Sequence, residues 1–176
     1  PYYRDGELIN CKYRSRDKFF RMESGAERVL YGLDDIKGDD KAIIVEGEMD
    51  KLACEMAGYT AVLSVPDGAP SSASTNFGSK FDYLQDERLQ AVSSWIIAVD
   101  NDAPGLLLRE ELVRRLGAEK CAVVTWDSDC KDANDVLIKW GVENLKRCIE
   151  TAVAVPVEGD RKSTRLNSSH ITISYA

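Results

Sequence analysis

The chain of 176 residues carries 23 Lys+Arg against 30 Asp+Glu, a formal net charge of −7, with 44% hydrophobic and 30% charged residues. This composition is typical of a globular domain with a sizeable core, and no apolar run approaches the roughly 20 residues of a membrane helix. The five scattered cysteines lack the CxxC spacing of a zinc site, which favours free thiols in a reducing compartment.

The two ends of the sequence give separate expectations. No signal peptide is recognisable, and the chain begins at Pro1 instead of methionine, so we expect a fragment that can lack upstream segments. Residues 161–176 contain no Asp or Glu, hold the only histidine, His170, and resemble translated adaptor sequence. Three of the 23 Lys+Arg lie there, so residues 1–160 carry 20 basic against 30 acidic residues, a charge of −10. Without His170, catalytic triads of the usual serine or cysteine type are excluded.

The first 40 residues predict short strands and turns. ELINCKYR (residues 7–14) alternates in polarity and is followed by KFFRM (residues 18–22), a pattern that predicts an antiparallel hairpin. Basic side chains gather on this segment, including Lys12 and Arg14. A polar connection punctuated by glycine then leads to Lys41.

From Lys41 onward, short apolar runs alternate with amphipathic ones. The runs predict strands over residues 42–46, 60–65, 94–99 and 121–126, and helices over 48–58, 81–90, 104–117, 132–141 and 143–152. This alternation predicts an α/β fold, a parallel four-stranded sheet flanked by helices on both faces. In such sheets ligands bind beyond the carboxyl ends of the strands.

Acidic motifs stand where two of these strands end. Glu46 closes the first strand and Asp50 follows about one helical turn later, while Asp100 and Asp102 follow the third strand. Carboxylates gathered at one edge repel each other unless a cation neutralises them, and Mg²⁺ prefers such oxygen ligands. The sequence therefore predicts a Mg²⁺ site for phosphoryl or nucleotidyl chemistry.

Both motifs also have a purely structural interpretation. Asp50 could favour the start of a helix through the helix dipole, but this leaves Glu46 beside Gly47 unexplained. An N-cap before the next helix needs only one of Asp100 and Asp102, so the second would be a surplus charge.

Two weaker motifs complete the pattern. Asp132 and Asp135 in KDAND have the spacing of a capping box, and capping is the default interpretation there. The loop over residues 66–80 is rich in Gly, Pro and Ser, and Gly68 could expose backbone N–H groups to phosphate.

The order of the motifs resembles that of the Toprim domain shared by primases and topoisomerases: EGxxD, then a strand and a loop, then DxD, then KDAN. The likeness is strongest to the primase half of phage-type primase-helicases and their plant organellar relatives, the Twinkle family. The segments that carry it are VEGEMDKL, SVPDGAP, VDNDAPG, RRLG and KDANDVL, preceded by YRDGELINCKYR and LYGLDDIKG. The resemblance covers about residues 1–155. It implies the β-rich start of a primase RNA-polymerase region over 1–40, a Toprim domain over 41–155, and a linker remnant with a non-native tail over 156–176.

The resemblance implies a Mg²⁺- or Mn²⁺-dependent DNA primase that makes RNA primers from ribonucleoside triphosphates on single-stranded DNA. The acidic residues that it assigns to catalysis are Glu46, Asp50, Asp100, Asp102 and Asp132. Among these, Glu46, Asp100 and Asp102 would hold the metals, and a general-base role for Glu46 stays open. Lys12, Arg14 and Lys131 would neutralise triphosphate or template charge, although the first two could instead form a solvated hairpin face.

Two parts of the family pattern are missing from this sequence, the cysteines of the template-reading zinc module and the GxxxxGK[ST] loop of the helicase. We expect a helicase domain in the same full-length chain, a mitochondrial or chloroplast location, and no membrane partner. Two other functions stay open, a Toprim nuclease and a non-catalytic metal- and DNA-binding module of a replicative helicase. The primase-like upstream strands disfavour the first, and the intact carboxylates disfavour the second.

Overall fold

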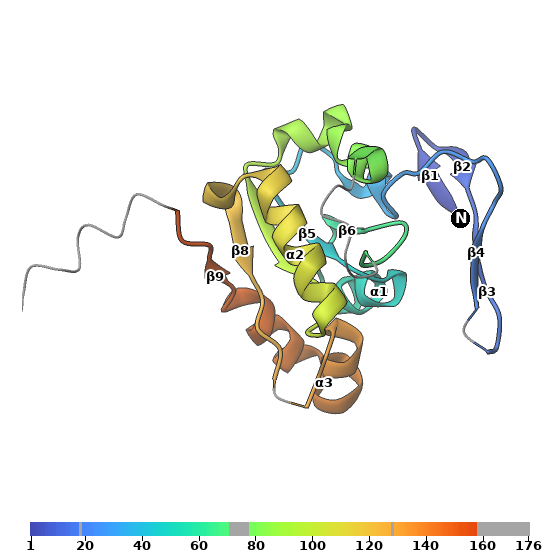
Figure 1. Ribbon diagram of the computed structural model, residues 1–176. Coiled ribbons are helices and arrows are strands. Elements are labelled where there is room, and N and C mark those ends of the chain that lie inside the picture. The colour runs from blue at the N-terminus through green and yellow to red at the C-terminus, as the bar shows by residue number, and fades with distance from the viewer. Residues whose placement is uncertain (18, 71–77, 128, 158–176) are drawn as a thin grey trace, which may run out of the picture.

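The computed structural model describes residues 1–17, 19–70, 78–127 and 129–157. The N-terminal part is a pair of two-stranded antiparallel ribbons beside an α/β unit (Figure 1). Strand β1 (Tyr2–Arg4) pairs with β2 (Glu7–Asn10), and β3 (Lys12–Arg14) pairs with β4 (Phe20–Met22).

The predicted hairpin over residues 7–22 is confirmed in its second half, where β3 pairs with β4. The alternating run breaks at Cys11, and its first half pairs with β1 instead. The turn between β1 and β2 is Asp5–Gly6, and both residues have positive φ, as a two-residue type I′ hairpin requires. The Asn10 side chain stabilises the chain where β2 ends, because it accepts a hydrogen bond from the Cys11 N–H and donates one to the carbonyl of Glu27.

The α/β unit is built on a five-stranded sheet in the order β6-β5-β7-β8-β9. Its strands are β5 (Lys41–Val45), β6 (Val62–Ser64), β7 (Ser94–Ala98), β8 (Cys121–Val123) and β9 (Val153–Ala154). The first four are parallel, as predicted, and β9 adds an antiparallel edge beside β8.

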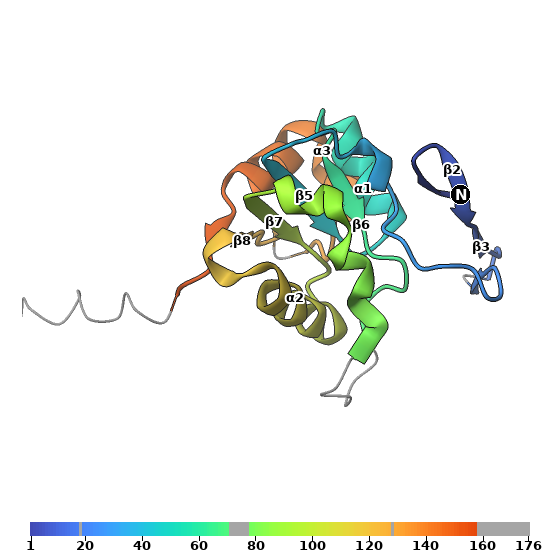
Figure 2. The same cartoon turned by 90° about the horizontal axis from the view of Figure 1, so that it is seen from above.

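Helices cover both faces of this sheet (Figure 2). Helices α1 (Glu48–Met56) and α3 (Ala133–Glu150) lie on one face, and α2 (Ala103–Leu116) lies on the other. Side chains of β5 alternate between two cores: Ile43 packs in the cluster that contains Cys54 and Leu145, and Ile44 in the cluster that contains Leu108. Burial on both faces explains why the strands are nearly continuous apolar runs.

The remaining elements are short 3₁₀ turns, η1 (Leu33–Asp35), η2 (Gly78–Gln85), η3 (Glu87–Ala91) and η4 (Ala118–Lys120). The helix predicted over residues 81–90 is therefore two 3₁₀ segments, because Asp86 caps the second through the N–H of Arg88. The two helices predicted around Gly141 are confirmed as the halves of α3, which Gly141 divides with φ 80° and ψ 178°. Among the described residues no helix is long and apolar enough to cross a membrane.

The connections of the sheet determine where a ligand would bind. The chain leaves β5 toward β6 on one side and returns to β7 on the other side of β5. The connections diverge at the carboxyl ends of β5 and β7, which is the crevice where open α/β sheets bind ligands. Glu46 directly follows β5, and Asp100 lies two residues after β7.

Candidate metal centre

Three carboxylates meet at this edge of the sheet. Asp50 in α1, Asp100 after β7 and Asp132 at the start of α3 each present an oxygen, and these three atoms lie within 4.8 Å of one another. Asp50 and Asp132 are buried, and Asp100 is half-buried. Three segments distant in the sequence therefore contribute one ligand atom each to a single point.

The backbone around Gly105 fixes the position of Asp100. The N–H of Gly105 donates to Asp102 Oδ1 at 2.9 Å, which makes Asp102 the N-cap of α2. A Cβ at Gly105 would lie 2.1 Å from the carbonyl oxygen of Asp100, so only glycine fits at this position. The N–H of Asn101 donates to the carbonyl of Lys131 at 2.7 Å and ties this loop to the start of α3.

Capping positions the carboxylate at the start of α3. Asp132 Oδ1 accepts the N–H of Asp135 at 2.7 Å, which confirms the predicted N-cap. Asp50 Oδ1 accepts the N–H of Asn134 at 3.1 Å. The first turn of α3 therefore donates hydrogen bonds both to α1 and to its own N-cap. The capping interpretation of KDAND is thus correct, and the same carboxylate also joins the acidic cluster.

Glu46 lies beside the cluster, and only one of its two carboxylate oxygens has a hydrogen-bond partner among the described residues. Its Oε1 accepts the N–H of Ala69 at 3.2 Å, in the loop that contains Gly68. Its Oε2 is buried and has no hydrogen-bond partner among the described residues. Burial raises the pKa of Glu46, and the negative charge of Asp100 raises it further. A buried carboxylate oxygen without a partner beside other carboxylates is suited to a cation.

The charges at this edge are not balanced by the protein. Lys131 Nζ lies 2.8 Å from Asp100 Oδ2 and 3.3 Å from Asp132 Oδ2, and its hydrogen bond to Asp100 raises its own pKa. Burial still raises the pKa of Asp100 despite this lysine. Burial, followed by the charge of Asp132, raises the pKa of Asp50 to about 7. The donor set of hard oxygens, one buried oxygen without a partner and a surplus of negative charge fit a divalent metal ion.

The structure separates the predicted site residues into two groups. Asp50, Asp100 and Asp132 come together, and Glu46 is close enough to feel the charge of Asp100. Asp102 is exposed and caps α2, while its charge also raises the pKa of Glu46.

The three predicted cations lie in different surroundings. Lys131 contacts the cluster itself, whereas Lys12 Nζ bonds Glu48 Oε1 at 2.7 Å and the carbonyl of Pro66 at 3.0 Å. Arg14 is exposed on the ribbon, and the part of the chain that the structure describes shows no contact between it and the cluster.

One residue of this region was not predicted. Glu48 accepts hydrogen bonds from the Tyr2 hydroxyl and from Lys12, so it joins both ribbons to the first turn of α1. Desolvation by burial raises the pKa of Tyr2, and the hydrogen bond to Glu48 adds to this. No local pattern pairs residue 2 with residue 48, so the sequence carried no signal for this contact.

The crossover sheet and the carboxylates at its switch point agree with the class that the family comparison gives: residues 40–125 match the family model of the Toprim domain, so the chain carries a Toprim domain. The chain is 44% identical over 171 residues to the Twinkle homolog protein, chloroplastic/mitochondrial, of Arabidopsis thaliana, covering 90% of this chain and 24% of the relative. It is also 44% identical over 170 residues to the Arabidopsis primase homolog protein, covering 89% of this chain and 50% of that protein. The chain therefore spans half or less of the length of these two relatives.

A solved structure shares the fold. The primase fragment of the bacteriophage T7 primase-helicase protein superposes with a TM-score of 0.68 at 25% identity, over 84% of this chain and 60% of that one. The predicted resemblance to the primase part of phage-type and Twinkle-type proteins is thereby confirmed.

Proposed function

We propose that this chain is the catalytic part of a DNA primase that joins ribonucleotides on single-stranded DNA in a reaction dependent on Mg²⁺ or Mn²⁺. The observation that carries the proposal is the convergence of Asp50, Asp100 and Asp132 on one point, beside the unpartnered oxygen of Glu46. These residues lie at the switch point of the sheet, and two relatives of this chain are a Twinkle homolog and a primase homolog.

The residues of the site would divide the work of nucleotidyl transfer. Asp50, Asp100, Asp132 and Glu46 would hold the metal, and Asp102 lies near enough to assist from the start of α2. A bound divalent ion lowers the pKa of an attacking hydroxyl and stabilises the charge that develops on the leaving oxygen.

The cations of the site would bind the substrates. Lys131 is half-exposed at the rim of the acidic cluster, where its ammonium can turn from the carboxylates toward a triphosphate. Lys12, in β3, donates to the carbonyl of Pro66, in the loop whose Ala69 N–H bonds Glu46. Both cations would offset the repulsion between an acidic protein and polyphosphate.

The relatives extend the proposal to the whole protein. One is named as a chloroplastic and mitochondrial protein, and the T7 protein is a primase-helicase. We therefore place this primase in an organelle, with a helicase domain as its partner in the full-length chain.

Primer synthesis tests the proposal directly. The chain is incubated with labelled ribonucleoside triphosphates and single-stranded DNA in Mg²⁺ or Mn²⁺, and products and template are resolved on a gel. We expect oligoribonucleotides from the wild type, and a fall of at least about 100-fold for Asp100→Asn, which removes a ligand charge without changing shape. Glu143→Gln, an equivalent change on the exposed side of α3, is the matched control and should leave synthesis unchanged.

Other outcomes would reject the primase assignment. A shortened template without oligoribonucleotides would identify a nuclease that uses the same carboxylates. If the wild type forms no product and leaves the template intact, also after a zinc module from a relative is attached, the domain is a non-catalytic module. Equal synthesis by the wild type and Asp100→Asn would remove this carboxylate from the catalytic site.

A further inference from the structure

The ribbon formed by β3 and β4 exposes aromatic side chains that no core explains. Phe20 is 57% exposed, Tyr13 49% and Phe19 76%, and none of them belongs to either buried cluster. A two-stranded ribbon has little stability of its own, and these exposed aromatic side chains add no buried core to it. Such surface is typical of an interaction site.

Cations flank the aromatic rings on this ribbon. The register pairs Arg14 with Phe20 and Lys12 with Met22, so these four side chains share one face. Lys12 Nζ lies 5.3 Å from the centroid of the Phe20 ring, and the Arg14 guanidinium lies 5.4 Å from it. Both cations therefore lie over the Phe20 ring at cation–π distance, while the side chain remains 57% exposed.

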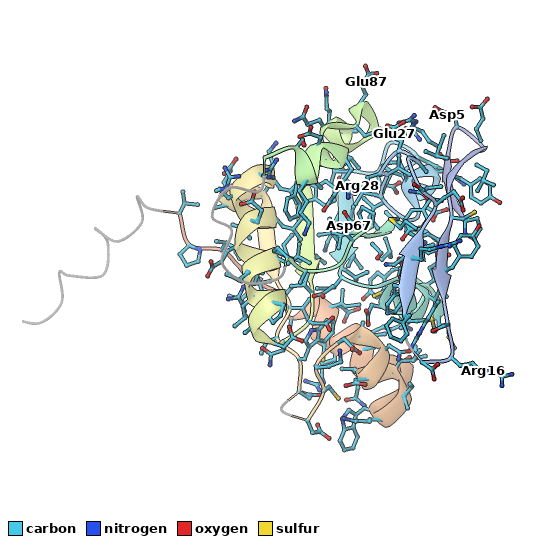
Figure 3. All side chains as sticks on the ribbon, turned by 45° about the vertical axis from the view of Figure 1, so that its right-hand side comes forward. Asp5, Arg16, Glu27, Arg28, Asp67 and Glu87 are labelled. Carbon is cyan, nitrogen blue, oxygen red and sulfur yellow. The ribbon has the colours of Figure 1, made fainter. Side chains whose placement is uncertain are left out.

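Lys12 pairs with Glu48, but the arginines of the ribbon are not neutralised within the described part of the chain. Arg14, Arg16 and Arg21 form no ion pair there, whereas Arg28 pairs with Asp67 and Arg88 with Asp34. Arg16 extends from the tip of the ribbon away from the rest of the molecule (Figure 3). A locally basic surface on a chain with a net charge of −7 indicates an anionic partner.

The Phe20 face of the ribbon lines a cleft that reaches the loop after β6. Phe20 and Lys12 line an open cleft of about 760 Å³ whose opposite wall includes Pro66 and Tyr83. Lys12 bonds the carbonyl of Pro66, and the same loop supplies the N–H that holds Glu46. A strand lying in this cleft would run from Phe20 to the loop that bonds Glu46.

We propose that Phe20, flanked by Lys12 and Arg14, is a stacking platform for a base of single-stranded DNA that enters the catalytic crevice along this cleft. The ring offers a π-face to the base, and the two cations lie where the adjoining phosphates would pass. A strand of DNA fits both features, since it repeats a flat base and an anionic phosphate at each nucleotide. The inference rests on the proposed function, because a template is expected only if the site acts on nucleic acid.

A comparison of normal and abasic DNA tests base stacking on Phe20 separately from the binding of phosphates by the cations. Binding of fluorescent oligothymidylate, and of an abasic oligonucleotide of equal length, is measured by anisotropy at low salt in EDTA. We expect Phe20→Ala to weaken oligothymidylate binding about tenfold, the effect of losing one base–aromatic stack, and to leave abasic binding unchanged. Phe20→Trp should restore or exceed wild-type affinity for oligothymidylate.

Two controls separate stacking from other effects. Phe19→Ala removes the neighbouring, more exposed ring, which points to the opposite side of the strand, and should change neither affinity. Arg14→Gln should weaken both oligonucleotides and reduce the slope of log K against log salt by about 0.7, because it removes one phosphate contact. Circular dichroism of each variant verifies the fold.

Three outcomes would overturn the proposal. They are wild-type affinity of Phe20→Ala for oligothymidylate, an equal loss on the abasic strand, or no measurable binding of the wild type to oligothymidylate at low salt. The assay contains neither metal nor nucleotide, so it does not depend on catalysis. If primer synthesis fails while base-dependent binding at Phe20 holds, the catalytic proposal alone is rejected. The reverse result rejects the stacking platform alone.

Discussion

Asp50 shows how burial places an ordinary helix residue in an acidic cluster. It lies in the first turn of α1, where a carboxylate would favour the helix dipole, yet its side chain is buried against Asp132. Desolvation by burial and the charge of Asp132 raise its pKa from 3.8 to about 7. The ionised form is therefore disfavoured in the folded protein until a cation binds.

The stability of the metal-free protein should depend on the charge of Asp50. Because the folded pKa is raised, the protonated carboxyl contributes stability that is complete below about pH 4 and is lost as the pH rises through about 7. In EDTA at pH 8, the unfolding free energy of Asp50→Asn should exceed that of the wild type by up to about 4 kcal/mol. Near pH 4 the two unfolding free energies should be equal. Urea unfolding across this pH range measures the difference.

A matched variant shows whether the effect belongs to this carboxyl. Glu87→Gln changes an exposed carboxylate on the far edge of the molecule and should follow the pH profile of the wild type (Figure 3). Parallel profiles for Asp50→Asn and the wild type would mean that Asp50 titrates normally in the folded state.

At the scale of elements, the start of α2 joins helix capping to metal binding. Asp102 caps the helix, so Asp100 is free to face the cluster, and Gly105 lets the first turn close against the carbonyl of Asp100. One short loop thereby fixes the helix start and the position of a ligand. The sequence DNDAPG combines these requirements in six residues.

Gly105→Ala should damage both the helix start and the metal centre. The added Cβ would meet backbone at 2.1 Å, so the loop must move and displace Asp100. We expect a loss of about 3 kcal/mol in unfolding free energy, in the range of severe overpacking, together with loss of the Mg²⁺-dependent increase in Tm. Leu107→Ala, on the exposed side of the same helix, should retain the Mg²⁺ response. A normal Mg²⁺ response in Gly105→Ala would show that the loop tolerates the methyl group.

At the scale of the whole molecule, Glu48 links the N-terminal ribbons to the Toprim domain. Tyr2 of β1 and Lys12 of β3 both donate hydrogen bonds to Glu48. Across the same boundary Arg28 forms an ion pair with Asp67, with an N–O distance of 2.7 Å. Figure 3 shows Arg28 and Asp67 between the ribbons and the sheet. The position of the ribbons, and of the cleft that they line, thus depends on a few polar contacts.

Loss of Glu48 should loosen the ribbons without unfolding the sheet. Glu48→Ala leaves the buried Tyr2 hydroxyl and Lys12 without their acceptor, which costs about 1–3 kcal/mol. Hydrogen exchange should become faster in β1 to β4 and stay unchanged in β5 and β7. Exchange that rises equally throughout would mean that ribbons and sheet unfold as one unit.

The sequence alone determined the four parallel strands, the three α-helices and the acidic edge of the sheet. Alternating runs of strand and helix leave little choice of topology, and carboxylates that follow parallel strands must share one edge. The motif EGxxD…DxD…KDAN also identified the family correctly. These features are local or periodic, and their physical meaning does not depend on distant residues.

Only the tertiary structure decided which carboxylates meet. Asp102 and Asp132 both cap helices, yet Asp132 joins Asp50 and Asp100 within 4.8 Å, while Asp102 remains exposed. Likewise, nothing near Phe20 in the sequence indicates that it lines a cleft beside Pro66. Such relations depend on how α1, α3 and the ribbons pack against one sheet, and packing joins residues that have no connection along the chain.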